Sequence, residues 1–374
     1  MAQTSEHSHV VLSPPVDKRD ELLLKIRGQT AHLPDLRPIF QDWKGISHRH
    51  VSPWLEPLRD TVNQKIQSLS FSTEKQKRLE RTDFALFTAL WWPDTSPECL
   101  ETLAYLVIWL FTWDDEIDEP SGAYSESLSG AQTYRDQTLR FVNSCLGLTD
   151  TAQGEHDLKP QSHIVQSFDV IGYALRSFYN ESQLRRFGDE IERFMRASEV
   201  EQLGRLRGEI PTLDEYWSFR LGTSAVYIGS AVGEYSMAAH LPLHVMNSSA
   251  MCALWDETNI IISITNDLLS LRKEIKLGCL DSIVPLTFAT TMDMNEAMAL
   301  SVAALQASKK RFDEAARELL SEEPRLEPEV QEKIREFIEI QRSNCVGNLI
   351  WSLETKRYDV SGVRNNDQSI DFSL

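Results

Sequence analysis

Apolar residues recur every three or four positions over most of the chain. This spacing is typical of one face of an α-helix. It runs through "PWLEPLRDTVNQKIQSL", "QLRRFGDEIERFMRASEVEQLGRL" and "NEAMALSVAALQASKKRFDEAARELL", and through "PEVQEKIREFIEIQRSNCVGNLIWSLETKRY" near the C-terminus. Alternating strand patterns and turn dipeptides between apolar runs are not found. The pattern therefore predicts an all-α protein with ten or more helices.

Short loops separate the predicted helices, and none of them is biased enough in composition to be a domain linker. Pro, Gly, Ser and Asp cluster in "WPDTSPE" and "EPSGAYSES", for example. The first residues are polar with a Pro pair, and the residues after Tyr358 have no sustained period. We predict three segments: a partly disordered N-terminal segment over 1–34, one helical domain over 35–360, and a flexible C-terminal tail over 361–374.

Composition narrows the partners and the cellular setting. The net formal charge of −18 disfavours nucleic-acid backbones and anionic membranes as partners. No apolar run approaches the ~20 residues of a membrane span, so membrane insertion is not expected. The five cysteines are scattered without a C-x-x-C pair, which argues against a disulfide framework or a zinc cluster. We expect a cytoplasmic protein, and a homodimer stays open.

An acidic cluster directly prolongs a strongly apolar helix. In "LFTWDDEIDEP", Asp114 and Asp118 are four residues apart and share one helix face. They lie at a helix C-terminus, where the helix dipole disfavours negative charge, and they also repel one another. Two interpretations follow: a solvated acidic helix end, or a site for a hard cation such as Mg²⁺. This motif alone does not decide between them.

A second set of oxygen-bearing side chains follows about 150 residues later. In "NDLLSLRKE", Asn266, Ser270 and Glu274 are spaced i, i+4 and i+8 and therefore lie along one helix face. Neutral oxygens mixed with one carboxylate suit a Mg²⁺ ion that also accepts phosphate oxygens and water. The alternative is a polar stripe that faces solvent.

Together these motifs resemble the paired metal sites of class I terpene synthases. The family's D-D-x-x-D motif is matched by "DDEID" at 114–118, and its N-D-x-x-S-x-x-x-E motif is matched from Asn266. A diphosphate-sensing Arg is expected about 46 residues before that Asn, where Arg220 stands. "WSLETKRY" supplies the family's C-terminal Trp351 and Arg-Tyr pair. The chain most resembles microbial members, above all fungal sesquiterpene cyclases.

The resemblance implies a class I terpenoid synthase helical bundle with a central active-site cavity and three Mg²⁺ ions. The implied metal ligands are Asp114, Asp118, Asn266, Ser270 and Glu274. The implied diphosphate contacts are Arg220, Lys273, Arg357 and Tyr358. Arg220, Trp351 and Tyr358 are the implied catalytic residues, and the cavity candidates are Phe87, Phe111, Thr223, Ser224 and Trp351. The first two acids after Asp114, Asp115 and Glu116, are expected to be solvated or to act behind the ligands.

The small residues of "LGTSAVYIGS" predict a helix break near Gly222, just after Arg220. By position, Thr223 and Ser224 match what the family calls its linker and effector. The resemblance implies that backbone carbonyls face the cavity at this break.

The resemblance implies an enzyme of secondary metabolism, a lyase that acts on a prenyl diphosphate. Its expected reaction is the Mg²⁺-dependent ionisation and cyclisation of farnesyl diphosphate (C15) to a sesquiterpene hydrocarbon or alcohol. The alternative is a diterpene cyclase acting on geranylgeranyl diphosphate (C20). A prenyl elongase would need a second Asp-rich motif, and a class II cyclase would need D-x-D-D; neither is present. A non-enzymatic helical scaffold would not require these motifs in register.

Overall fold

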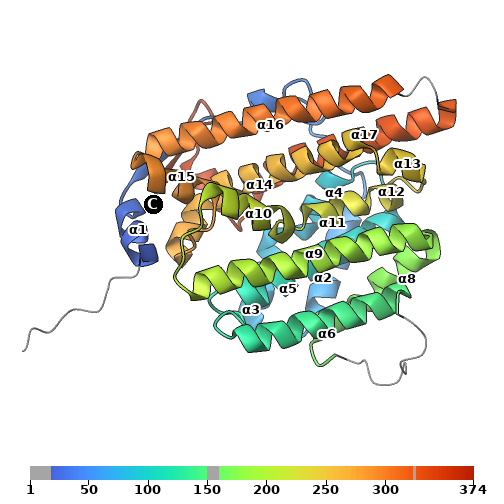
Figure 1. Cartoon of the computed structure of the whole chain (residues 1–374), viewed down its shortest axis with the longest axis horizontal. Coiled ribbons are helices and arrows are strands. Elements are labelled where there is room, and N and C mark those ends of the chain that lie inside the picture. Colours follow the sequence, from blue (N-terminus) through green and yellow to red (C-terminus); the bar gives the residue numbers. More distant parts are fainter. Residues whose placement is uncertain (1–17, 150–159, 323–325) are drawn as a thin grey trace, which may run out of the picture.

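The computed structural model describes residues 18–149, 160–322 and 326–374. Helices account for nearly all of the regular structure, which confirms the predicted all-α fold. The long helices α6, α9 and α16 run along the long axis of the molecule (Figure 1). Residues 1–17 of the predicted N-terminal segment lie outside the described residues.

The elements follow one another as a series of helices with one short strand near each terminus. The N-terminal part contains α1 (Lys18–Ile26), β1 (Thr30–Leu33), the 3₁₀ helix η1 (Arg37–Phe40), α2 (Leu55–Ser68), α3 (Thr73–Thr82), α4 (Phe84–Trp91) and α5 (Pro97–Asp118). The middle contains α6 (Leu128–Leu146), α7 (His163–Gln166), α8 (Asp169–Phe178), α9 (Glu181–Leu206), α10 (Leu213–Thr223), α11 (Val226–Ala231), α12 (Gly233–Ser236) and α13 (Leu243–Met246). The C-terminal part contains α14 (Ser249–Leu277), α15 (Ile283–Thr291), α16 (Met294–Glu322), α17 (Pro328–Glu354), the 3₁₀ turn η3 (Ser361–Val363) and β2 (Ile370–Ser373).

Local sequence signals set the ends of the two helices that carry the acidic motifs. At the start of α5, the Ser96 side chain accepts a hydrogen bond from the backbone N–H of Cys99, and Pro97 occupies the first helical turn. At the start of α14, Ser248 caps the backbone N–H of Met251 in the same way. Gly278 ends α14 with a φ of 79°, the left-handed conformation that glycine adopts without strain. Both motifs therefore lie in the C-terminal parts of well-capped helices.

A helix break follows Arg220, close to the position predicted at Gly222. α10 continues through Gly222 and ends at Thr223, and the chain turns at Ala225, whose φ is 57°. Gly222 instead lies where α10 packs against α9, because a Cβ at this position would collide with the Cβ of Ala197. The break therefore begins at the linker and effector positions themselves.

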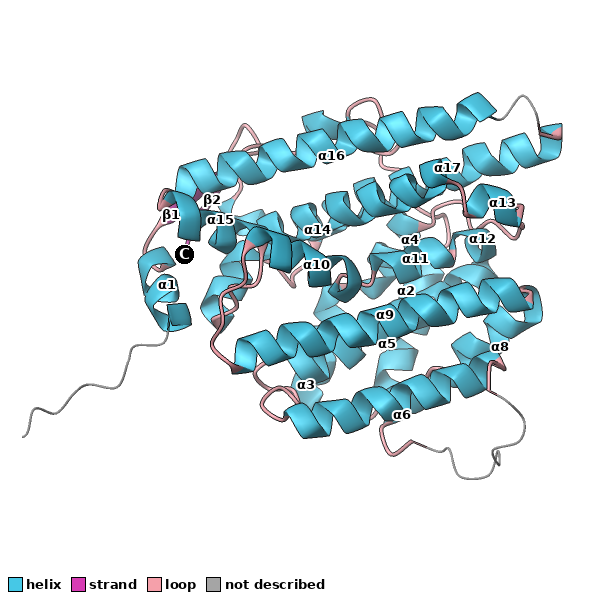
Figure 2. Cartoon of the chain, viewed as in Figure 1, coloured by secondary structure: helices cyan, strands magenta, loops and turns pink. Residues whose placement is uncertain are grey.

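The two ends of the described chain pair with one another. β1 and β2 form an antiparallel two-stranded sheet in which Leu33 lies opposite Ile370 and Ala31 lies opposite Phe372 (Figure 2). All four side chains are buried. Within the tail predicted to be flexible over 361–374, the structure places residues 361–363 in η3 and residues 370–373 in β2. The alternation in "IDFS" is too short to stand out from sequence, and its partner strand lies more than 330 residues away.

This pairing predicts that the tail contributes to stability. Replacing Phe372 by Ala should lower the free energy of unfolding by about 3–5 kcal/mol, the usual cost of removing a buried Phe side chain, because Phe372 is fully buried. Thermal and urea unfolding followed by circular dichroism measure this change. Replacing the exposed neighbour Ser373 by Ala should leave the unfolding curve unchanged. Equal curves for the two variants would mean that the tail is loosely attached.

The core is one continuous apolar cluster that includes the fully buried indoles of Trp92, Trp109, Trp113 and Trp351. α14 packs against both α16 and α17, and α17 packs against α4. Among the described residues, no helix is both long enough and apolar enough to cross a membrane.

Candidate active site

A cavity of about 260 Å³ opens between α4, α5, α9, α10, α11, α14 and α17. One end is polar and the other is apolar and aromatic. The structure brings every residue predicted for the site into the lining of this cavity: Phe87, Phe111, Asp114, Asp118, Arg220, Thr223, Ser224, Asn266, Ser270, Lys273, Glu274, Trp351, Arg357 and Tyr358. The central cavity is thereby confirmed, and the role of each residue remains a prediction.

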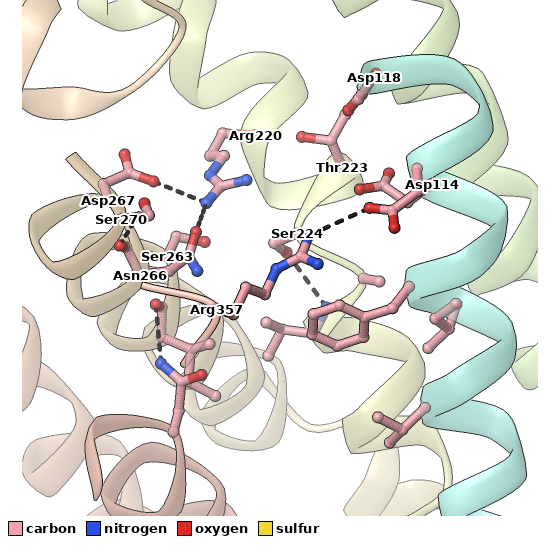
Figure 3. A pocket seen from close by; sticks show the side chains of 18 of the residues that line it. Asp114, Asp118, Arg220, Thr223, Ser224, Ser263, Asn266, Asp267, Ser270 and Arg357 are labelled. Carbon is pink, nitrogen blue, oxygen red and sulfur yellow. Dashed lines mark hydrogen bonds and ion pairs between the residues drawn. The ribbon is translucent and has the colours of Figure 1, made fainter. Parts of the chain in front are cut away.

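α5 forms an acidic wall at the polar end of the cavity. Asp114 and Asp118 lie on the same face of this helix and point toward the cavity (Figure 3). Burial and the neighbouring charge of Asp118 raise the pKa of Asp114 well above its usual range. Burial raises the pKa of Asp118 to about 6. The negative charges of these two carboxyl groups are poorly compensated. Asp118 Oδ1 is also buried without a hydrogen-bond partner among the described residues.

α14 forms the facing wall, with three oxygen-bearing side chains in line as predicted. Ser270 Oγ donates to the backbone oxygen of Asn266 at 2.7 Å and lies 2.6 Å from Glu274 Oε1. The other carboxylate oxygen of Glu274 is buried, and it has no hydrogen-bond partner in the described part of the chain. Burial, followed by the charge of Asp267, raises the pKa of Glu274 to about 7. This wall also carries a carboxyl group that lacks full compensation.

Four basic side chains line the cavity, namely Arg205, Arg220, Lys273 and Arg357, and each of the last three has an acidic partner. Arg220 Nη2 donates to Asp267 Oδ1 at 2.7 Å and to Asn266 Oδ1 at 2.9 Å (Figure 3). Arg357 Nη2 donates to Asp115 Oδ1 at 3.2 Å. Lys273 Nζ lies 3.5 Å from Glu119 Oε1. The polar end of the cavity therefore holds the local positive charge that an anionic ligand requires, although the whole chain is acidic.

Asp267 has a supporting role that sequence reasoning did not assign. Besides binding Arg220, its carboxylate accepts hydrogen bonds from the Tyr216 hydroxyl and from the backbone N–H of Ile283, the latter at 2.8 Å. These contacts hold the Arg220 guanidinium against Asn266. Asp267 is part of the quoted motif, so its position was visible in the sequence, but its partners come from two other helices, α10 and α15.

The two middle acids of "DDEID" differ in their surroundings. Asp115 is buried and pairs with Arg357, and Arg78 lies 3.6 Å away. Glu116 pairs with Lys75 at 2.5 Å, away from the predicted ligands. Asp115 therefore orients a predicted diphosphate contact, whereas Glu116 joins α5 to α3.

Glu201 on α9 is a cavity residue that the sequence did not reveal. It lines the polar end, and burial together with the charge of Asp118 raises its pKa to about 8. In "ASEVEQLGRL" it is one of two acids, and the same amphipathic helix carries others before this stretch, so no pattern separates it from its neighbours.

Aromatic rings surround the cavity just below the polar end. Trp351 meets Phe87 edge to face at a centroid distance of 5.0 Å, and meets Phe111 at 5.9 Å. Its indole N–H donates to the backbone oxygen of Thr82 at 2.9 Å, which fixes the ring. Contrary to prediction, the Arg-Tyr pair does not continue the last long helix. α17 ends at Glu354 and the chain turns, so that the Tyr358 ring lies 5.5 Å from Trp351.

The donor set at the polar end fits a hard cation shared with an anion. Within the described residues, no three His, Cys, Asp or Glu side chains come together as a metal cluster. The oxygen donors instead stand on two facing walls, each with a buried carboxylate oxygen that lacks a hydrogen bond, namely Asp118 Oδ1 and Glu274 Oε2. Such oxygens are the ligands that Mg²⁺ prefers, and Mg²⁺ usually completes its shell with water and substrate phosphates.

Sequence comparison shows which family shares this arrangement. Residues 105–311, which span α5 through most of α16, match the family described as "Terpene synthase family 2, C-terminal metal binding". The chain belongs to the terpene synthase family. This terpene synthase is 34% identical over 347 residues to the sesquiterpene cyclase hepA of Aspergillus oryzae, covering 92% of this chain and 93% of the relative. It is 28% identical to the silphinene synthase peniA of Penicillium patulum, covering 91% and 88% of the two chains.

Solved structures of terpene synthases share the fold. An α-eudesmol synthase superimposes with a TM-score of 0.69 at 20% identity, covering 81% of this chain and 96% of that one. Hedycaryol synthase in complex with HEPES gives a TM-score of 0.69 at 19% identity, covering 82% and 96%. The predicted membership of the fungal-type class I terpene synthases is thus confirmed, and the chain is a terpene cyclase.

Proposed function

We propose that this terpene synthase ionises farnesyl diphosphate and cyclises the resulting cation to a sesquiterpene hydrocarbon or alcohol, with release of diphosphate. The observation that carries the proposal is one cavity that joins two facing oxygen-donor walls and four basic side chains to an aromatic, apolar end. The name of the relative hepA, a sesquiterpene cyclase, supports a C15 substrate. The diterpene alternative differs only in the length of the chain that the apolar end must accept.

The polar end suits the leaving group. Breaking the allylic C–O bond leaves a diphosphate anion, so groups aimed at that anion lower the barrier. Asp114 and Asp118 on one wall, and Asn266, Ser270 and Glu274 on the other, would hold Mg²⁺, for which we expect three ions. When bound, Mg²⁺ supplies positive charge that offsets the charge developing on the leaving group. The side chains expected to contact the diphosphate directly are Arg220, Lys273, Arg357 and Tyr358.

The apolar end suits the cation. A carbocation survives only where water and other nucleophiles are excluded. Aromatic faces attract a cation without adding to it, at about 0.5–2 kcal/mol for each contact. Trp351, Phe87 and Phe111 form such a cluster directly below the polar end. We therefore assign the stabilisation of the first cations to these three rings.

The experiment that tests this function offers the purified protein a series of substrates. C10, C15, C20 and C25 prenyl diphosphates are incubated with Mg²⁺, and the organic extract is examined by gas chromatography and mass spectrometry. We expect cyclic C15 products from farnesyl diphosphate, and none when EDTA replaces Mg²⁺. The absence of a terpene product from every substrate would overturn the proposal.

The role assigned to Trp351 gives a separate prediction. Replacing Trp351 by Leu should change the product distribution more than it slows consumption of farnesyl diphosphate, because the ring contacts the cations and not the leaving group. The measurement compares product ratios with the rate of diphosphate release. An unchanged product profile would mean that Trp351 only packs against Phe87 and Tyr358.

A further inference from the structure

The apolar end of the cavity is closed by an indole that has no role in the function proposed above. Trp91, the last residue of α4, lines the cavity together with Leu106 and Val107 of α5 and Gly229 of α11. Val107 lies seven residues before Asp114 on the same helix, which corresponds to about 10 Å at 1.5 Å per residue. These residues therefore form the end of the cavity farthest from the carboxylates.

The backbone beneath Trp91 is held rigidly by α17. Asn344 Nδ2 donates to the backbone oxygen of Trp91 at 2.8 Å. One turn further along α17, Gly347 lets the backbone of α4 approach closely, since a Cβ there would lie 2.7 Å from the Leu90 oxygen. The Trp91 ring also stacks on Phe87 at a centroid distance of 4.4 Å. The backbone of Trp91 therefore cannot shift without disturbing the packing of α4 on α17, and the ring is in contact with Phe87.

The Trp91 ring also rests against a glycine, Gly229 of α11. A Cβ added at Gly229 would lie 3.0 Å from Trp91 Cζ3, closer than ordinary packing allows. The Trp91 indole N–H is buried and has no hydrogen-bond partner within the described residues. A buried Trp usually finds such a partner, so the contribution of this ring is its size and not a hydrogen bond.

We propose that the Trp91 ring, packed against Phe87 and Gly229, is the floor that limits the prenyl chain to fifteen carbons. This inference rests on the proposed function, because the diphosphate must be held at the carboxylate end for the floor to measure the chain. A C20 substrate carries five more carbons into the same closed end. A close-packed interior does not yield enough space for an added isoprene unit, so the longer chain is excluded.

A variant with a smaller floor should admit the longer chain. Replacing Trp91 by Leu should raise the ratio of kcat/KM for C20 over C15 by at least about tenfold, the effect that even a small change of pocket volume produces. Replacing Trp91 by Phe should give a smaller increase in the same direction. Both variants are assayed with geranylgeranyl and farnesyl diphosphates in competition, and the melting temperature confirms that each is folded.

A variant with less space at the apolar end of the cavity should favour a shorter prenyl chain. Replacing Gly229 by Ala adds a methyl group beside the indole in the cavity lining, and should lower the ratio of kcat/KM for C15 over C10 by at least about tenfold. Replacing Gly204 by Ala is the matched control. Gly204 lies on α9 with no atom within 4 Å of an added Cβ, so the chain-length ratios should stay unchanged.

The outcomes separate this inference from the proposed function. If the wild-type protein converts no prenyl diphosphate, the proposed function is wrong. If it converts C15 but C20 equally well, or if Trp91→Leu gains no C20 activity, the floor is wrong while the function stands. If the Trp91 variants do not fold, the Gly229→Ala ratio decides, and a ratio equal to that of Gly204→Ala overturns the inference.

Discussion

Replacing Glu274 by Gln, or Asn266 by Ala, should lower kcat/KM for farnesyl diphosphate by at least about 10²–10³-fold, the loss seen when one group that stabilises developing charge is removed. Glu274 is the only carboxylate of the predicted ligand set on α14, and one of its oxygens has no hydrogen bond among the described residues. The Asn266 side chain accepts a hydrogen bond from Arg220 and donates another to the Tyr358 hydroxyl at 2.6 Å. Each substitution therefore disturbs the facing wall and its link to the diphosphate contacts.

The fold should survive these substitutions. Gln keeps the size of Glu274 and its contact with Ser270, so the melting temperature without Mg²⁺ should stay close to that of the wild-type protein. Replacing Asp256 by Asn on the same helix is the control. Asp256 is exposed, binds Tyr227 and lies outside the cavity, so turnover should change by less than about twofold. Retained activity in Glu274→Gln and Asn266→Ala would mean that the metal assignment on α14 is wrong.

Replacing Asp114 by Asn should lower activity by a similar factor but raise the stability of the metal-free protein. Asp114 stands in a buried cluster of acids, where burial and Asp118 disfavour its charged form. Removing one charge from this cluster should raise the melting temperature by about 1–3 °C, since about 1 kcal/mol moves it by about 2–4 °C in a 150–250-residue domain and less in a longer chain. Functional sites often carry this opposition between stability and activity.

The adjacent acid is the matched comparison for this effect. Asp115 is buried and pairs with Arg357, so replacing it by Asn leaves the buried guanidinium poorly compensated. Breaking a buried ion pair on one side costs about 3–5 kcal/mol, so Asp115→Asn should melt at a lower temperature than the wild-type protein. Differential scanning calorimetry without Mg²⁺ measures both variants. If Asp114→Asn and Asp115→Asn were destabilised equally, the negative charge of Asp114 would not be the uncompensated charge of a cation site.

The walls of the site were predictable from the sequence because each lies within a single helix. The four-residue spacing places Asp114 with Asp118, and Asn266 with Ser270 and Glu274, whatever the rest of the fold does. That the two walls face one another came from the family resemblance, since spacing along one helix says nothing about a helix 150 residues away.

The parts that the sequence could not predict depend on contacts between distant segments. Asp267 acquires its role from Tyr216 and Ile283, and Asp115 from Arg357. The tail was expected to be flexible because a four-residue strand has no visible period, and the strand is recognised only by its pairing with β1. Likewise, the end of α17 at Glu354, which returns Tyr358 to Trp351, has no Gly or Pro signal in "WSLETKRY".

The walls of α5 and α14 should hold Mg²⁺ only together with a diphosphate. Calorimetric titration with inorganic diphosphate tests this expectation most directly. For the wild-type protein we expect saturable binding of diphosphate in the presence of Mg²⁺ and none in EDTA. Asp114→Asn and Glu274→Gln should each weaken binding at least about tenfold, as loss of a ligand group does, because either wall alone is incomplete. Binding of diphosphate that is equally tight in EDTA, or in both variants, would contradict the account.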